Sequence, residues 1–178
     1  MYESDKVQSG LLVRYEERFA QLRDVPVRYL EVGIWRGGSL RWAADFFRHP
    51  ESRITGVDLL VAPVFDEPRI QQFHADQRDP SGLRRIGQMA GPFDIVIDDA
   101  SHLPAETQAT FEALWPHVRS GGWYVIEDWC APFSHGPIYN GIELVVTEIA
   151  RQKPRHGIAE MAILAYGNNS SHAFYRKA

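Results

Sequence analysis

The stretch Tyr29-Leu30-Glu31-Val32-Gly33-Ile34-Trp35-Arg36-Gly37-Gly38-Ser39 has the pattern of a buried strand, a glycine turn and the start of a helix. Glycines such as Gly33, Gly37 and Gly38 let the backbone approach a ligand closely and adopt positive φ. The first N–H groups of the helix, around Ser39, are free to bind that ligand. The stretch therefore predicts a nucleotide-type pocket. Its spacing is not G-x-G-x-x-G, which argues against a dinucleotide, and a tight turn without a ligand is the alternative.

Segments with strand and helix patterns alternate on both sides of this turn. Runs rich in β-forming residues occupy 27–32, 53–58, 69–74, 93–98 and 123–127. Apolar residues recur at helical spacing in 8–23, 39–47, 105–118 and 141–150. This alternation predicts the α/β class, with a doubly wound, mostly parallel sheet. Two late runs, 161–165 and 172–175, flank Gly167-Asn168-Asn169 and predict an antiparallel edge hairpin, which completes a seven-stranded sheet.

Length and composition set limits on the kind of protein. The 178 residues are expected to form a single domain, 1–178, with a helical preamble over 1–25. A net charge of −4 without a Lys/Arg run gives no reason to expect nucleic acid as a partner. The start of the chain has no signal-peptide pattern and no apolar run is long enough to span a bilayer, so we expect a cytoplasmic protein. Cys130, the single cysteine, is expected to be a small, semi-buried side chain rather than a reactive thiol.

Acidic and polar residues follow the first three predicted strands. Glu31 precedes the glycine turn, where a carboxylate suits a cationic ligand such as the sulfonium and amino group of S-adenosylmethionine (SAM). Asp58 ends the second strand, near the offset at which an acidic residue binds ribose hydroxyls in doubly wound folds. Asp76 and Gln77 follow the third strand and could face an adenine, although both could be ordinary loop residues. These groups predict a row of ligand contacts at the carboxyl edge of the sheet.

The stretch Phe93-Asp94-Ile95-Val96-Ile97-Asp98-Asp99-Ala100-Ser101-His102 is an apolar strand that ends in two aspartates and a histidine. The next strand ends in Glu127 and Asp128. If the two strands are neighbours, Asp99, Glu127 and Asp128 converge and repel one another unless a metal neutralises them. Oxygen ligands favour Mg²⁺ first, with Mn²⁺ or Ca²⁺ as alternatives. His102 could accept a proton at the same place. The alternatives are helix-capping carboxylates and a structural histidine.

These motifs together resemble the metal-dependent sugar O-methyltransferases of macrolide antibiotic tailoring, of the mycinamicin and macrocin type. The resemblance rests on the glycine turn with its Glu31, on Gly56-Val57-Asp58, on the stretch from Asp94 to His102 and on Gly122-Trp123-Tyr124-Val125-Ile126-Glu127-Asp128. The opening Ser4-Asp5-Lys6 is similar as well. The resemblance covers roughly residues 4 to 130 and implies a Rossmann-like class I methyltransferase fold.

The resemblance also implies roles for individual residues. Asp99, Glu127 and Asp128 would hold Mg²⁺, and the metal would bind vicinal sugar hydroxyls while His102 acts as the base. Asp98 would lie near the amino acid or sulfonium end of SAM. The remaining residues implied at the SAM site are Glu31, Gly33, Asp58, Asp76 and Gln77.

The expected function is methyl transfer from SAM to a hydroxyl oxygen of a small acceptor, most simply a sugar diol of a glycosylated natural product. Trp35 and Trp129, at the mouth of the pocket, would pack against the acceptor or serve as core or rim packing, and residues 131–140 would form an acceptor lid. The alternatives are a catechol-type O-methyltransferase and a non-catalytic SAM-binding module; a nicotinamide dehydrogenase is less favoured. Whether the chain forms a homo-oligomer stays open.

Overall fold

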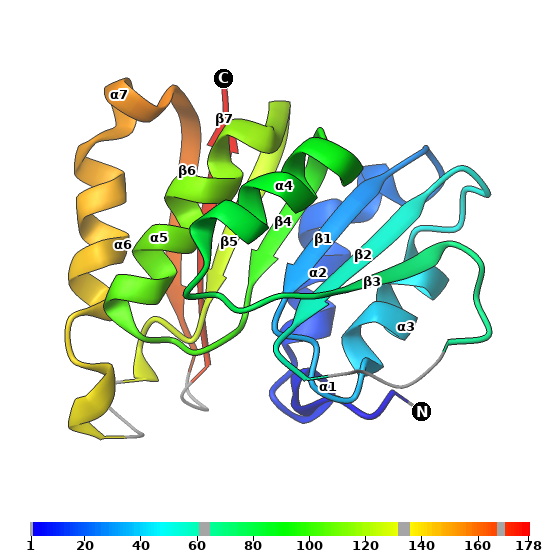
Figure 1. The fold of residues 1–178 in the computed structure, drawn as a ribbon, viewed down its shortest axis with the longest axis horizontal. Helices are drawn as coiled ribbons and strands as arrows, with labels where there is room; N and C mark the ends of the chain where they lie inside the picture. The colour runs from blue at the N-terminus through cyan, green and yellow to red at the C-terminus, as the bar shows by residue number, and fades with distance from the viewer. Residues whose placement is uncertain (1, 61–64, 132–135, 167–169) are drawn as a thin grey trace.

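A computed structural model of the chain describes residues 2–60, 65–131, 136–166 and 170–178 and shows a seven-stranded sheet in the order β3-β2-β1-β4-β5-β7-β6 (Figure 1). The parallel strands are β1 (Arg28–Val32), β2 (Arg53–Asp58), β3 (Ile70–His74), β4 (Phe93–Asp98) and β5 (Val118–Glu127). β7 (Ser171–Lys177) runs antiparallel to β5, and β6 (Ile158–Ala165) runs antiparallel to β7 at the edge. The predicted α/β fold with an antiparallel edge hairpin is confirmed.

Helices cover both faces of the sheet (Figure 1). α4 (Pro80–Ala90), α5 (Pro104–Leu114) and α6 (Ile142–Arg151) pack on one face, and α2 (Leu11–Phe19) and α3 (Gly38–Phe46) pack on the other. Successive residues of β4 enter the two cores in turn, with Val96 on the α4–α6 side and Ile95 on the α2–α3 side. Burial on both faces explains why this strand is apolar from Ile95 to Ile97, between Asp94 near its start and Asp98 at its end. The shorter helical segments are α1 (Asp5–Gln8), η1 (Ala20–Leu22), η2 (Trp115–His117), η4 (Pro137–Tyr139) and α7 (Lys153–His156).

Two predicted helices differ from the observed ones because of a single residue each. Gly10 has a φ of 75°, in the left-handed region, and it separates α1 from α2 within the helix predicted over 8–23. Pro116 has no N–H to continue an α-helix, so α5 ends at Leu114 and a 3₁₀ turn follows. Local backbone chemistry thus overrode a helical apolar pattern in both places.

α4 was not among the predicted segments, although its sequence carries a helix-start signal. The Asp79 side chain accepts a hydrogen bond from the backbone N–H of Ser81, and Pro80 occupies the first helical position. Leu83 and Ile86 then recur on the buried side. β5 also begins earlier than predicted, at Val118, because the strand continues through Gly121 and Gly122.

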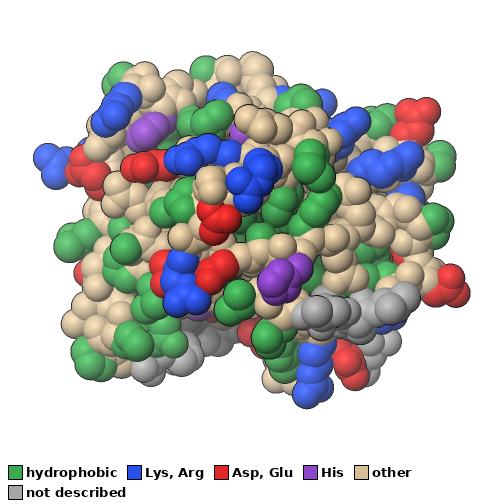
Figure 2. Space-filling model, viewed as in Figure 1, with side chains coloured by type: hydrophobic (Ala, Val, Ile, Leu, Met, Phe, Trp, Pro, Cys, Tyr) green, Lys and Arg blue, Asp and Glu red, His purple; other side chains and the backbone are tan. Residues whose placement is uncertain are grey.

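Acidic and basic side chains are interspersed on the face shown in Figure 2. Within the described ranges, no helix combines the length and the apolar character needed to cross a bilayer. Cys130 is buried, somewhat more fully than expected. The predicted turn at 167–169 lies outside the described residues.

Candidate active site

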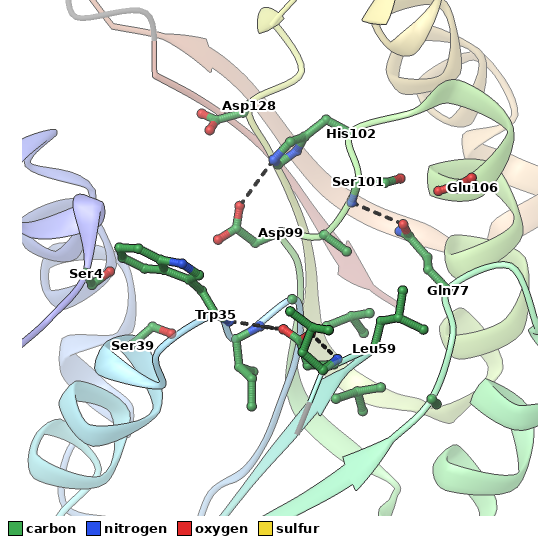
Figure 3. A pocket seen from close by; sticks show the side chains of 18 of the residues that line it. Ser4, Trp35, Ser39, Leu59, Gln77, Asp99, Ser101, His102, Glu106 and Asp128 are labelled. Atoms are coloured by element: carbon green, nitrogen blue, oxygen red, sulfur yellow. Dashed lines mark hydrogen bonds and ion pairs between the residues drawn. The ribbon is translucent and has the colours of Figure 1, made fainter. Parts of the chain in front are cut away.

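A cavity of about 650 Å³ lies at the carboxyl ends of the parallel strands (Figure 3). This is the edge at which open α/β sheets bind ligands, and the volume is typical of small-molecule sites. The predicted site residues that line it are Gly33, Gly38, Ser39, Asp58, Asp76, Gln77, Asp99, His102 and Asp128. The predicted residues that do not line it are Glu31, Gly37, Asp98 and Glu127.

The glycine turn after β1 forms one wall of the cavity. Gly33 has a φ of 89°, and a Cβ atom there would overlap the backbone carbonyl of Asp99, so glycine is required by both conformation and space. Oδ2 of Asp58 accepts hydrogen bonds from the backbone N–H groups of Ile34 and Trp35, at 2.8 and 3.0 Å. Asp58 therefore orders the turn, in addition to lining the cavity. Gly37 adopts a left-handed conformation directly before α3.

The loop after β3 contributes a second wall. The Gln77 side chain is 7% exposed and connects two neighbours, because its Nε2 donates to Asp98 Oδ1 at 2.9 Å and its Oε1 accepts from the Ser101 backbone N–H at 3.2 Å. Burial raises the pKa of Asp98 to about 8. Asp98 therefore does not line the cavity itself, but it holds the Gln77 side chain, which does. Asp76 is paired with Arg78 at 2.7 Å, which holds the pKa of its carboxyl below the usual value.

Lys6 lies beside the acidic strand ends and was not predicted as a site residue. Its ammonium Nζ is 2.6 Å from Glu31 Oε1, 2.9 Å from Asp99 Oδ2 and 2.6 Å from Glu127 Oε1. We call Glu31, Asp99 and Glu127 the inner cluster. Lys6 therefore supplies positive charge at a place where the sequence predicts a metal alone.

Two tyrosines complete the environment of the inner cluster. Tyr15 donates to Glu127 Oε1 at 2.6 Å, and Tyr29 donates to Glu31 Oε2 at 3.0 Å. Glu31 and Glu127 are 0% and 1% exposed, respectively. Direct contact of Glu31 with a ligand in the cavity would require Lys6 to move. The sequence signal for Lys6 was its place in the Ser4-Asp5-Lys6 motif.

Asp99, His102 and Asp128 form an outer cluster that faces the cavity (Figure 3). Each can offer a ligand atom within 4.8 Å of the others, and His102 Nε2 is 3.7 Å from Asp99 Oδ1. His102 and Asp128 have φ values of 56° and 49°, in the left-handed region that side chains rarely adopt. Such strain at cavity residues is typical of functional sites.

The outer cluster has the chemistry of a divalent cation site. Oδ1 of Asp128 is buried without a hydrogen-bond partner, an arrangement that costs free energy unless a cation or donor satisfies it. Burial, together with the Glu127 carboxylate, raises the pKa of Asp128 to about 7. The same two causes raise the pKa of Asp99 well above its usual range, against the effect of Lys6. The two carboxylates, Asp99 and Asp128, offer the oxygen ligands that Mg²⁺ or Mn²⁺ prefers.

His102 has the properties of a proton acceptor. Burial lowers its pKa, so the imidazole is neutral near pH 7 and has a nitrogen available to take a proton. The Tyr139 ring lies 6.5 Å from the His102 ring, centroid to centroid. Tyr139 belongs to the predicted acceptor lid, residues 131–140, of which 132–135 lie outside the described part of the chain.

The two tryptophans predicted at the mouth have different positions. Trp35 lines the cavity, is 63% exposed and has a φ of 44° (Figure 3). Trp129 does not line it. Its ring packs against the core on the α4–α6 face of the sheet, and its indole N–H donates to the Leu164 carbonyl at 3.2 Å. Trp35 is therefore the tryptophan available to a bound molecule.

Known proteins resemble this chain in both sequence and fold. Residues 30–129 match a family model described as a methyltransferase domain. The chain is 46% identical over 125 residues to mycinamicin VI 2''-O-methyltransferase of Micromonospora griseorubida, a match that covers 66% of this chain and 31% of that protein. It is 46% identical over 135 residues to 8-demethyl-8-(2-methoxy-alpha-L-rhamnosyl)-tetracenomycin-C 3'-O-methyltransferase of Streptomyces olivaceus, with 71% and 33% covered.

A solved methyltransferase structure also matches the fold of the chain. The MycE methyltransferase from the mycinamycin biosynthetic pathway, in complex with Mg, SAH and mycinamycin VI, matches with a TM-score of 0.75 and 34% identity. The match covers 93% of this chain and 49% of that one. The chain thus spans less than half the length of the relatives that it matches. Because the family model covers more than half of the chain, including the glycine turn and both acidic strand ends, the chain belongs to the methyltransferase-domain family.

Proposed function

We propose that the chain transfers the methyl group of SAM to a hydroxyl oxygen of a sugar on a glycosylated small molecule, with the help of Mg²⁺. The observation that carries the proposal is a single cavity in which the glycine turn meets the acidic strand ends, Gly33 being in close contact with the Asp99 backbone. Two further findings support it: the relatives are named as O-methyltransferases, one of them of a rhamnosyl tetracenomycin, and the MycE complex contains Mg and SAH.

The donor half of the cavity supplies SAM contacts of three kinds. The backbone of Gly33, Gly38 and Ser39 allows the methionine part to approach closely. Asp58, at the end of β2, is placed for the ribose hydroxyls. Asp76 and Gln77 are placed for the adenine, and Asp98 acts by holding Gln77.

The acceptor half contains the outer cluster. Mg²⁺ held by Asp99 and Asp128 would lower the pKa of the acceptor hydroxyl and fix its position. His102 takes the hydroxyl proton on its imidazole nitrogen. The two halves of the cavity hold donor and acceptor so that the methyl carbon and the attacking oxygen approach in line. Glu127, the third predicted metal ligand, does not line the cavity, whereas Asp99 does. Its Oε1 accepts hydrogen bonds from Lys6 and Tyr15.

The test is calorimetric titration of SAM and then Mg²⁺ into the wild type and Asp99→Ala. SAM is expected to bind both proteins, whereas Mg²⁺ is expected to bind only the wild type, because Asp99 belongs to both clusters. A wild type that does not bind SAM would refute the proposed function. If SAM binds and Mg²⁺ never does, even with an acceptor present, the acidic strand ends have another role.

The acceptor class needs a separate assay. Mass spectrometry after incubation with SAM should detect a methylated product from a rhamnosylated polyketide or macrolide. Methylation of a catechol and of no glycoside would instead support the catechol-type alternative. SAM binding without turnover on any diol would support a binding module.

Replacing Trp35 with alanine is expected to raise the KM for the acceptor about tenfold, because the exposed ring offers an apolar face to a sugar. The Kd for SAM should stay within about threefold of the wild type. Trp129→Phe is the matched control, since that ring packs away from the cavity, and it should leave both constants unchanged. A parallel loss of SAM affinity in Trp35→Ala would place Trp35 on the donor side instead.

A further inference from the structure

Lys6 is an almost completely buried cation that lines the cavity. It is 3% exposed, and its ammonium has one carboxylate oxygen from each member of the inner cluster within 2.9 Å. The ammonium donates hydrogen bonds to Glu31 Oε1 and Glu127 Oε1, and it forms an ion pair with Asp99 Oδ2. The three carboxylates come from β1, from the residue after β4 and from the end of β5. One lysine from the amino-terminal segment therefore joins three strand ends.

The inner and outer clusters share Asp99 but differ in their charge balance. The inner cluster holds the Lys6 ammonium against Asp99 Oδ2, while Asp99 Oδ1 is turned toward His102 in the outer cluster. The outer cluster has a buried, unpartnered oxygen on Asp128. A cation is thus already present on one side of Asp99, and the need for one remains on the other side.

We propose, on the basis of the function proposed above, that Lys6 is a positioning residue of the metal site: its ammonium occupies the inner cluster as a built-in cation and confines a divalent ion to the outer cluster, which faces the cavity. Lys6 holds one oxygen each of Asp99 and Glu127, so those oxygens are not available to the ion. The ion is then left where an acceptor hydroxyl in the cavity can reach it.

Without the Lys6 ammonium, the inner cluster would be open to a divalent ion. The inner cluster has ligand atoms within 4.8 Å of one another, and without Lys6 its buried carboxylates would have no positive partner. Uncompensated buried carboxylates cost free energy, and their oxygens are the ligands that hard divalent cations prefer. The variant is therefore expected to bind a divalent ion more tightly and in the wrong cluster, while methyl transfer falls.

The experiment is a titration of the 178-residue chain with Mn²⁺ alone, with free Mn²⁺ measured by electron paramagnetic resonance. Lys6→Met is expected to bind Mn²⁺ at least about tenfold more tightly than the wild type, because one nearby positive charge has been removed. The double variant Lys6→Met/Glu31→Gln has the same formal charge as the wild type in this cluster and should return to within about threefold of it. Lys177→Met is the matched control, because that lysine contacts backbone carbonyls and no carboxylate.

The alternatives give different results. If Lys6→Met folds and binds Mn²⁺ with wild-type affinity, the inference is wrong while the proposed function stands. If Lys6→Met does not fold, Glu31→Gln decides the question: its lower negative charge should weaken Mn²⁺ binding at least about threefold, and unchanged affinity would overturn the inference. A wild type that binds SAM but not Mn²⁺ would refute the metal part of the proposed function, and the inference with it.

Discussion

Replacing His102 with glutamine is expected to lower kcat for methyl transfer by about 10²- to 10⁴-fold, the usual contribution of a general base. Glutamine keeps a polar side chain of similar reach but cannot take the acceptor proton at neutral pH. His102 lies in the outer cluster, on the acceptor side of the cavity, so the Kd for SAM should not change. The measurement is kcat and KM with a confirmed acceptor, together with SAM affinity by calorimetry.

The pH profile separates a missing base from a disturbed cavity. If only the proton acceptor is lost, the residual rate of His102→Gln should rise about tenfold per pH unit as solvent hydroxide replaces it. A merely structural role of His102 would not give that slope. Activity within about fivefold of the wild type, or a matching loss of SAM binding, would contradict the assignment of His102 as the base.

The sequence predicted the sheet and the positions of the acidic groups for the same physical reason. Apolar runs such as Phe93–Asp98 are buried on both faces, so their pattern is clear, and parallel strands bring their carboxyl ends to one edge. Asp99 and Asp128 therefore lie close together, with His102 beside them, whereas Glu127, predicted to join them, groups with Glu31 and Asp99 instead. Side chains alternate along a strand, which is why Asp98 interacts with Gln77 on the opposite side from Lys6.

The sequence could not predict the position of Lys6. α1, which contains it, is four residues long, and no local pattern indicates where so short a segment packs on a sheet. The contact between Lys6 and Glu127 joins residues 121 positions apart. The unbalanced negative charge at the strand ends was evident from the sequence, but a metal and a distant lysine both satisfy it. Only the packing of α1 against the strand ends distinguishes them.

Replacing His172 with phenylalanine is expected to reduce the loss of unfolding free energy that accompanies a fall in pH below about 6.5. His172 is 0% exposed in β7, surrounded by the Tyr15 and Phe174 rings at 4.7 and 5.1 Å, and its Nε2 has no hydrogen-bond partner. Burial, with the positive charges of Lys6 and Arg14, lowers its pKa to about 3. An unfolded chain holds histidine at a pKa of about 6.5. Between these values the unfolded state binds a proton that the folded state does not.

The sign and size of the effect follow from this difference. The contribution of His172 to stability is complete above about pH 6.5 and is lost as the pH falls toward 3, by about 1.4 kcal/mol per pH unit. Between pH 7.5 and pH 5 the wild type should lose about 2 kcal/mol from this group, and His172→Phe should not. The raised pKa values of Asp98 and Asp128 act in the opposite direction, but they are common to both proteins and cancel in the comparison.

Urea unfolding at a series of pH values measures this difference. Phe174→Leu is the matched control, because it loosens the same aromatic contacts without removing a titrating group. Its free energy of unfolding should fall by a similar amount at every pH, so that its profile runs parallel to that of the wild type. Parallel profiles for the wild type and His172→Phe would mean that the imidazole gains a proton in the folded state as readily as in the unfolded one. In that case the buried ring must have access to water or to a carboxylate on protonation, which would require movement of the packing between β7 and α2.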